Sequence, residues 1–149
     1  MTVDHALYVS RRMRDVDFKE VMATRWEEGT DRFALDVVNL PGIAFTAIGP
    51  HGLPVAIGGV AFHTPKVGTA WLVGTDEFTK SALSITRHVR RVIKDLLATE
   101  LNRIHAWSAC FHTDAHRWME HCGMNRGNPI KAMGKNGEDF YLYSVVKGS

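Results

Sequence analysis

Residues 69–97 read TAWLVGTDEFTKSALSITRHVRRVIKDLL, and this stretch decides the fold. Its first six residues, Thr69 to Gly74, contain β-branched and aromatic side chains that predict a strand. Apolar residues then recur at a helical spacing, which predicts an amphipathic helix with one buried stripe. The stripe consists of Ile85, Val89, Val92, Ile93 and Leu96.

The residues before this stretch predict an antiparallel meander. Strands are expected at 43–48, 53–62 and 69–74, because turn signals rich in glycine and proline separate them. Gly58 and Gly59 stand inside the second of these strands. A glycine pair in a strand indicates a bulge or a close backbone approach.

The N-terminal segment predicts one strand and two helices. A short β-prone run from Leu7 to Ser10 predicts the strand. Asp17 and Glu20 fit a capping box, so a helix is expected to begin at Asp17, and a second helix is expected over 31–38. The apolar face of the first helix would hold Phe18, Val21, Met22 and Trp26.

The C-terminal third predicts a strand at 104–109, a helix from Thr113 or Asp114 to His121, and a hairpin. The hairpin strands are expected at 130–133 and 140–145, on either side of an Asn-Gly turn. The full order, β-α-α-β-β-β-α-β-α-β-β, predicts one α/β (α+β) domain over residues 1–149. Its sheet would be mixed, mostly antiparallel and covered by helices on both faces.

Composition excludes several protein classes. Hydrophobic residues form 45% of the chain and charged residues 23%, which is typical of a globular protein with its own core. No apolar run is long enough to cross a membrane, and the first residues do not have the pattern of a signal peptide. Two cysteines are too few for a disulfide scaffold, so we expect reduced thiols in a cytoplasm.

Basic residues cluster on the predicted long helix, although the net charge of the chain is only +2. A solvated helix face explains the cluster most simply. A phosphate-bearing ligand is the second interpretation, and nucleic acid is the third. The cluster contains Arg87, His88, Arg90, Arg91 and Lys94.

The predicted element order and three motifs resemble the GNAT superfamily of N-acetyltransferases. Residues 12–17 are similar to its Arg-x-x-x-x-Asp start, and residues 115–124 to its Ala-x-x-x-Tyr-Glu-x-x-Gly-Phe block. Residues 133–141 are similar to its final hairpin. The resemblance implies a sheet whose central strands splay apart, with acetyl-CoA in the gap and an amine as the acetyl acceptor.

A more detailed resemblance is to the GNAT-like internal virion protein A family of short-tailed phages. It rests on Gly52–Gly59, on Thr75-Asp76-Glu77 and on Lys147-Gly148. This resemblance implies a phage protein in the cytoplasm of an infected host cell or associated with the virion. It implies a host protein or virion proteins as partners, and a homodimer is possible. The alternative function it implies is a catalytically degenerate scaffold that acts in virion morphogenesis or binds a host protein.

The GNAT resemblance also implies a set of residues that contact acetyl-CoA. The strand residues Leu72, Val73 and Gly74 would pair with the pantetheine. The following helix start would bind the diphosphate through free N–H groups and the helix dipole, although Leu83 replaces a glycine of the family's loop. The residues at this helix start are Lys80, Ser81, Ser84, Thr86 and Arg87.

His112 and Glu77, with Asp76 as a further candidate, would accept the proton of the acceptor amine. A surface or capping histidine is the structural alternative for His112. Met119 stands where many family members carry a tyrosine that protonates the CoA thiolate. Cys110, His112, His116 and His121 have a partial metal-ligand spacing, but no fourth ligand is in register, so no metal is expected.

Overall fold

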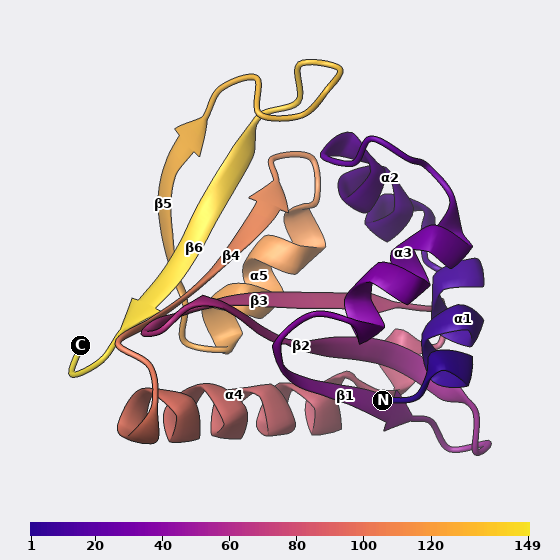
Figure 1. The fold of residues 1–149 in the computed structure, drawn as a ribbon, viewed down its shortest axis with the longest axis horizontal. Helices are drawn as coiled ribbons and strands as arrows, with labels where there is room; N and C mark the ends of the chain where they lie inside the picture. The colour runs from indigo at the N-terminus through magenta and orange to yellow at the C-terminus, as the bar shows by residue number, and fades with distance from the viewer.

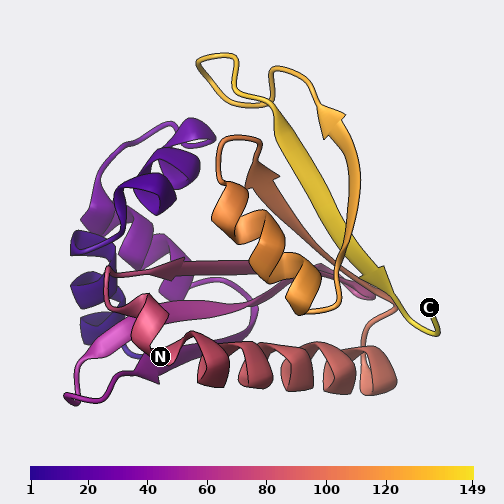
Figure 2. The same ribbon diagram turned by 180° about the vertical axis from the view of Figure 1, so that it is seen from behind.

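The structure is a computed structural model that describes residues 1–149. Its six-stranded sheet has the order β1-β2-β3-β4-β6-β5, and helices cover both faces (Figures 1 and 2). The α/β fold class predicted from the sequence is confirmed. The elements are α1 Val3–Arg11, α2 Asp15–Ala23, α3 Thr30–Val38, β1 Gly42–Ile48, β2 Pro54–Thr64, β3 Val67–Gly74, the 3₁₀ turn η1 Phe78–Ser81, α4 Ala82–Thr99, β4 Arg103–Ala109, α5 Thr113–His121, β5 Asn125–Ile130 and β6 Phe140–Val146.

Strands β1, β2 and β3 form the predicted antiparallel meander. The glycine pair in β2 marks a close backbone approach, because a Cβ atom at Gly59 would lie 2.2 Å from the carbonyl oxygen of Ile43. A Cβ atom at Gly58 would lie 2.9 Å from the carbonyl oxygen of Trp71. Both neighbouring strands therefore require glycine here, and the register shifts of β2 occur elsewhere, at its two ends.

The two faces of the sheet carry separate apolar clusters. On one face, α4 and α5 pack around Ile104 and Tyr143, both fully buried. On the other face, α1 and α3 pack around Val9 and Ile57, also fully buried. The apolar stripe of α4 faces the core as predicted, while its basic residues face solvent. None of the helices combines the length and apolarity needed to cross a membrane.

The first element is a helix, so the strand predicted at residues 7–10 is wrong. The hydroxyl oxygen of Thr2 accepts a hydrogen bond from the amide of His5 and caps the helix (3.1 Å). Ala6 and Val9 point into the core at helical spacing. Packing against α3 and β2 outweighs the β propensity of this short run, and β-type pairing survives only as a bridge between Met13 and Thr75.

Helix α2 begins at Asp15 and has no side-chain cap, so the predicted capping box is also wrong. The predicted apolar face is only partly buried, because Phe18 is exposed and Trp26 is fully exposed. Asp17 is instead one of the most buried residues of the helix, with 3% of its surface exposed. A buried carboxylate without a capping role needs another partner.

The C-terminal hairpin forms, but its first strand lies earlier than predicted. β5 covers 125–130 rather than 130–133, and Ala132 adopts a positive φ of 54° that ends the strand pairing. Gly137 supplies the positive φ of the turn, at 87°. All residues of β5 are exposed, since it is the edge strand and only β6 pairs with it.

Candidate active site

Strands β3 and β4 pair with each other over only part of their length. They are parallel neighbours from Val67 to Thr69 and from Arg103 to His105. Beyond these residues the strands diverge, which Figure 1 shows as β4 rising away from β3. β3 keeps its pairing with β2, and β4 keeps its pairing with β6. The backbone groups of β3 and β4 that face each other beyond the junction therefore have no strand partner.

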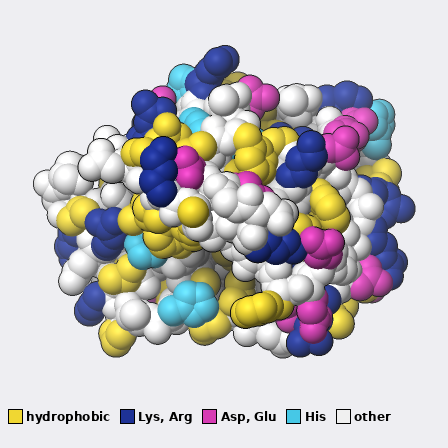
Figure 3. All heavy atoms as spheres, turned by 90° about the horizontal axis from the view of Figure 1, so that it is seen from above, with side chains coloured by type: hydrophobic (Ala, Val, Ile, Leu, Met, Phe, Trp, Pro, Cys, Tyr) yellow, Lys and Arg dark blue, Asp and Glu magenta, His cyan; other side chains and the backbone are white.

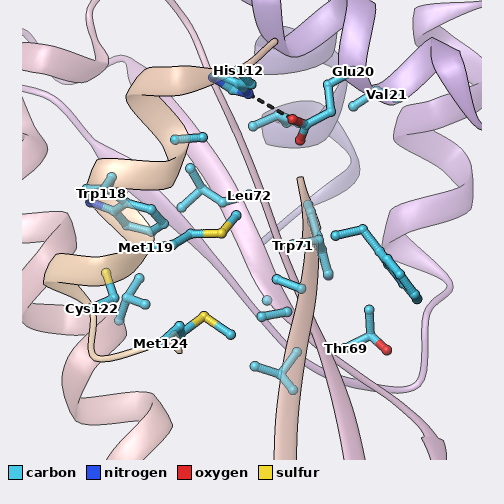
Figure 4. Close-up of a pocket in the computed structure, with 18 of the residues that line it drawn as sticks. Glu20, Val21, Thr69, Trp71, Leu72, His112, Trp118, Met119, Cys122 and Met124 are labelled. Carbon is cyan, nitrogen blue, oxygen red and sulfur yellow. Dashed lines mark hydrogen bonds and ion pairs between the residues drawn. The ribbon is translucent and has the colours of Figure 1, made fainter. Parts of the chain in front are cut away.

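A cleft of about 460 Å³ occupies the space between the parted strands. Its lining is mostly apolar and comes from both layers of the fold. Trp71 and Phe33 belong to the layer of α1 and α3. Leu72, Trp118 and Met119 belong to the layer of α4 and α5 (Figure 4). The cleft therefore passes between the strands and joins the two faces of the sheet.

Two carboxylates of α2 bind the diverging strand ends. Asp17 accepts a hydrogen bond from the amide of Gly74 in β3 (2.8 Å). Glu20 accepts one from the amide of Ala109 in β4 (3.0 Å). Arg14 holds Asp17 with a bidentate contact at 2.9–3.1 Å. Burial raises the pKa of Asp17, and the charge of Arg14 opposes this shift.

His112 lies between these two carboxylates and is 6% exposed. Its Nδ1 atom is 2.9 Å from Oε2 of Glu20, the contact drawn in Figure 4. Its Nε2 atom is 3.4 Å from Oδ1 of Asp17. Both ring nitrogens therefore face carboxylate oxygens, and the ring is neither a surface residue nor a side-chain cap.

One backbone amide of β3 is left facing the gap. Thr75 donates its amide hydrogen to Val55 of β2, while Gly74 donates toward α2. Because successive residues of a strand point their N–H groups to opposite sides, the amide of Leu72 points the same way as that of Gly74. Of the strand residues predicted to pair with pantetheine, Leu72 offers a free N–H, Val73 faces β2, and Gly74 is engaged by Asp17.

The predicted diphosphate-binding residues surround the start of α4 and lie outside the cleft lining. Lys80 forms an ion pair with Glu77 (2.7 Å). Thr86 donates to the carbonyl oxygen of Ala82 and accepts from the indole N–H of Trp118. Ser81, Ser84 and Arg87 have no side-chain hydrogen bond and reach solvent, Ser81 only partly. Leu83 is 65% exposed, so it does not fill the gap between the strands.

Of the two predicted proton acceptors, one lies in the cleft and the other lies outside it. His112 lines the cleft. Glu77 lies outside it, and its hydrogen bond to Lys80 lowers the pKa of its carboxyl group. Met119 lines the cleft with its thioether, and the neighbouring Cys122 thiol has a pKa raised to about 12 by burial. Neither sulfur atom is a proton donor near neutral pH.

Sequence reasoning missed Glu20, Asp17 and Arg14 as site residues. The signal was present, because carboxylates three positions apart share one helix face. The same spacing also fits a capping box, and the local sequence cannot separate the two. The residues with partial metal-ligand spacing do not assemble: His116 bonds to the carbonyl oxygen of Ala109 (2.9 Å), and His121 is exposed.

Two loops bind each other at the end of the molecule above the cleft. The amide of Lys135 donates to the carbonyl oxygen of Ala23 (2.7 Å), and its ammonium group pairs with Glu28 (2.7 Å). This contact joins the β5–β6 loop to the α2–α3 loop. Seen from above, this end mixes apolar, basic and acidic side chains, with no single charge sign dominating (Figure 3).

No family model matches the sequence, and no curated protein matches it. Solved structures do match the fold over nearly the whole chain. An acetyltransferase of the GNAT family from Bacillus anthracis is similar with a TM-score of 0.71 and 18% identity, over 100% of this chain and 93% of that chain. A ribosomal-protein-S18-alanine N-acetyltransferase from Escherichia coli is similar with a TM-score of 0.71 and 12% identity, over 99% and 88%.

A spermidine N-acetyltransferase variant from Vibrio cholerae gives a TM-score of 0.66 at 11% identity, over 99% of this chain and 92% of that chain. At these identities the likeness establishes the GNAT fold and leaves the activity to be argued from the site.

Proposed function

We propose that this protein is an N-acetyltransferase that moves an acetyl group from acetyl-CoA to a primary amine. The observation that carries the proposal is the parting of β3 and β4 after Thr69 and His105, with a cleft through the gap. A cleft lined by residues from both faces of the sheet would let two substrates approach one point from opposite sides. That arrangement suits direct attack of an amine on a bound thioester.

The free amide of Leu72 would bind the thioester carbonyl oxygen and stabilise the negative charge that develops there. The helix start at Ser81 and Ser84, with Lys80 and Arg87 beside it, would bind the diphosphate of CoA. Lys80 would exchange Glu77 for the diphosphate, since an exposed ion pair is weak. Val73 and Gly74 then serve to hold β3 in place.

Titration calorimetry with acetyl-CoA tests this proposal. We expect binding in the micromolar range, with about tenfold weaker binding after Lys80→Ala and Arg87→Ala together, because charge-assisted bonds to the diphosphate are lost. The matched control is Arg91→Ala with Lys94→Ala, which removes the same charge from later turns of α4. Absence of binding at millimolar acetyl-CoA would exclude the acetyltransferase function. Equal weakening in both double variants would refute the placement of the diphosphate.

A second function is a catalytically degenerate phage scaffold that acts in virion morphogenesis or binds a host protein. The observation in its favour is Met119, which puts a thioether in the cleft where the related enzymes carry a proton-donating tyrosine. Acetyl-CoA binding without CoA release, over a panel of primary amines and host-cell peptides, would support this function. Release of CoA with any of these acceptors would favour the enzyme.

A further inference from the structure

The Glu20 carboxylate has one engaged oxygen and one open oxygen. Oε2 accepts from the amide of Ala109 (3.0 Å), the hydroxyl of Ser108 (3.3 Å) and the ring of His112 (2.9 Å). Oε1 has no hydrogen bond and is not enclosed, while the side chain is 20% exposed and lines the cleft. A carboxylate fixed through one oxygen presents the other to a ligand.

Charged groups from two elements hold this carboxylate in place. His112, on the loop between β4 and α5, contacts Glu20 through one nitrogen and Asp17 through the other. Arg14 neutralises Asp17 from the far side. Two further charged residues line the cleft, Arg25 and Asp114, and Arg25 is already paired with Asp36. Glu20 is therefore the carboxylate of the cleft that has both a fixed position and an open oxygen.

Aromatic side chains form the wall next to Glu20. Thr69 and His105 are hydrogen-bonded across the strand junction (3.2 Å), so they lie on one face of the sheet. Alternate residues of a strand share a face, which places Trp71 and Trp107 on that same face. Both line the cleft, and Trp107 is 37% exposed at its opening. In Figure 4 the Glu20 carboxylate lies above the Trp71 ring.

We propose that Glu20 binds the ammonium group of the acceptor and takes its proton, and that the acceptor is a primary amine on an aromatic or apolar body that lies against Trp71 and Trp107. This inference rests on the proposed acetyl transfer. His112 and Asp17 are positioning residues that hold Glu20. The role of direct proton acceptor, assigned to His112 from the sequence, passes to Glu20 because both nitrogens of His112 face carboxylates.

The proposal requires the bound ammonium group and the thioester to meet beside β3. Gly74, which α2 binds, and Leu72, which faces the thioester, are about 6.6 Å apart along the strand. For the transfer, an ammonium nitrogen bound by Glu20 has to come within roughly 3–3.5 Å of the carbonyl carbon. The amine enters from the face of α1 and α3, opposite the face of α4.

The reaction balances without another reactant. The ammonium gives one proton to Glu20, and the resulting amine forms a C–N bond with the thioester carbon. The C–S bond breaks, and the second proton of the nitrogen goes to the CoA sulfur. This transfer makes a side-chain proton donor at position 119 unnecessary, and Met119 cannot donate a proton. The products are the acetamide and CoA thiol, and Glu20 releases its proton to solvent.

Calorimetry with 2-phenylethylamine, and with the neutral 2-phenylethanol, tests the binding part. Each probe is titrated into the free protein and into the CoA complex. We expect Glu20→Gln to weaken 2-phenylethylamine binding at least tenfold and to leave 2-phenylethanol and acetyl-CoA binding within twofold. The matched control Glu27→Gln changes an exposed carboxylate beyond the end of α2 and should bind both probes as the wild type does.

Acetylation of 2-phenylethylamine, followed by release of the CoA thiol, tests the chemical part. We expect Glu20→Gln to lower kcat/KM about 100-fold. His112→Asn, which keeps one N–H for Glu20, should lose less activity than His112→Ala, at unchanged acetyl-CoA affinity.

Two results would overturn the inference: equal amine affinity in the wild type and Glu20→Gln, or a wild type that binds acetyl-CoA and no apolar amine. Failure of the proposed function is distinguishable from both. It would appear as absent acetyl-CoA binding, while the titrations of the free protein with the two probes would still decide whether Glu20 receives an ammonium group.

Discussion

The backbone groups at the two ends of the β3–β4 pair find their hydrogen-bond partners in different ways. At the joined end, backbone groups from Val67 to Thr69 pair with β4, and Ile104 beside them is fully buried. At the parted end, Asp17 and Glu20 of α2 replace the missing strand and bind the amides of Gly74 and Ala109. Buried backbone groups need partners, so a sheet can open only where another element supplies them.

We expect the joined end of the β3–β4 pair to contribute strongly to the stability of the fold. Ile104→Ala, at this end, should have the largest effect. We expect the free energy of unfolding to fall by about 3 kcal/mol, because a fully buried side chain is lost and a cavity remains. Urea denaturation measures the change. Ile130→Ala on the exposed edge strand is the control and should cost well under half as much. Similar losses of unfolding free energy in both variants would show that the joined end contributes no more to stability than the edge strand does.

The parted end is where we propose that acetyl transfer takes place, and Met119→Tyr should sharpen that distinction. A phenol in the cleft supplies the proton donor that the thioether lacks, so turnover of 2-phenylethylamine should rise about tenfold. Release of the CoA thiol reports the rate. Met119→Phe adds the same ring without the hydroxyl group and should give no increase. If both variants behave alike, the position does not face the leaving sulfur.

Asp17→Asn tests how the parted end is held, with the smallest expected effect. The folded protein raises the pKa of Asp17, so the folded state binds its proton more readily than the unfolded state does. The stabilisation from Asp17 is therefore lost as the pH rises from the pKa of this group in the unfolded state, about 3.9, through its pKa in the folded state. The unfolding free energy of the wild type, minus that of Asp17→Asn, should increase as pH falls across this window.

Urea midpoints of the two proteins at several pH values between about 3 and 7 give this difference, and other carboxylates cancel in it. Asp15→Asn, an exposed change on the same helix, provides the control. A difference that shrinks toward acidic pH would mean that the ion pair with Arg14 outweighs the burial of Asp17.

Much of the fold could be predicted because its signals are local. The stripe from Ile85 to Leu96 and the turns of the meander identify α4 and the strands β1 to β3 by periodicity and turn chemistry alone. Residues 7–10 could not be assigned in this way. Their side chains suit a strand, and only contact with α3 and β2 selects the helix.

The candidate site was predicted less completely for the same reason. His112 was identified as a residue type that changes charge near neutral pH, but its two carboxylate partners were not. Lys80, Ser81, Ser84, Thr86 and Arg87 follow from a family pattern, and their contact with a diphosphate stays a prediction. Glu77 stays a prediction too, although its ion pair with Lys80 sets it outside the cleft.

The sequence by itself determined the order of most elements, the amphipathic α4 and the strands of the meander, because these depend on neighbours a few positions away. Only the tertiary structure decided which carboxylate lines the cleft with one oxygen left open. Glu20 and His112 are 92 positions apart in the chain, and no local pattern encodes their contact. They meet at the parted end, where Glu20 also accepts a hydrogen bond from the amide of Ala109 at the end of β4.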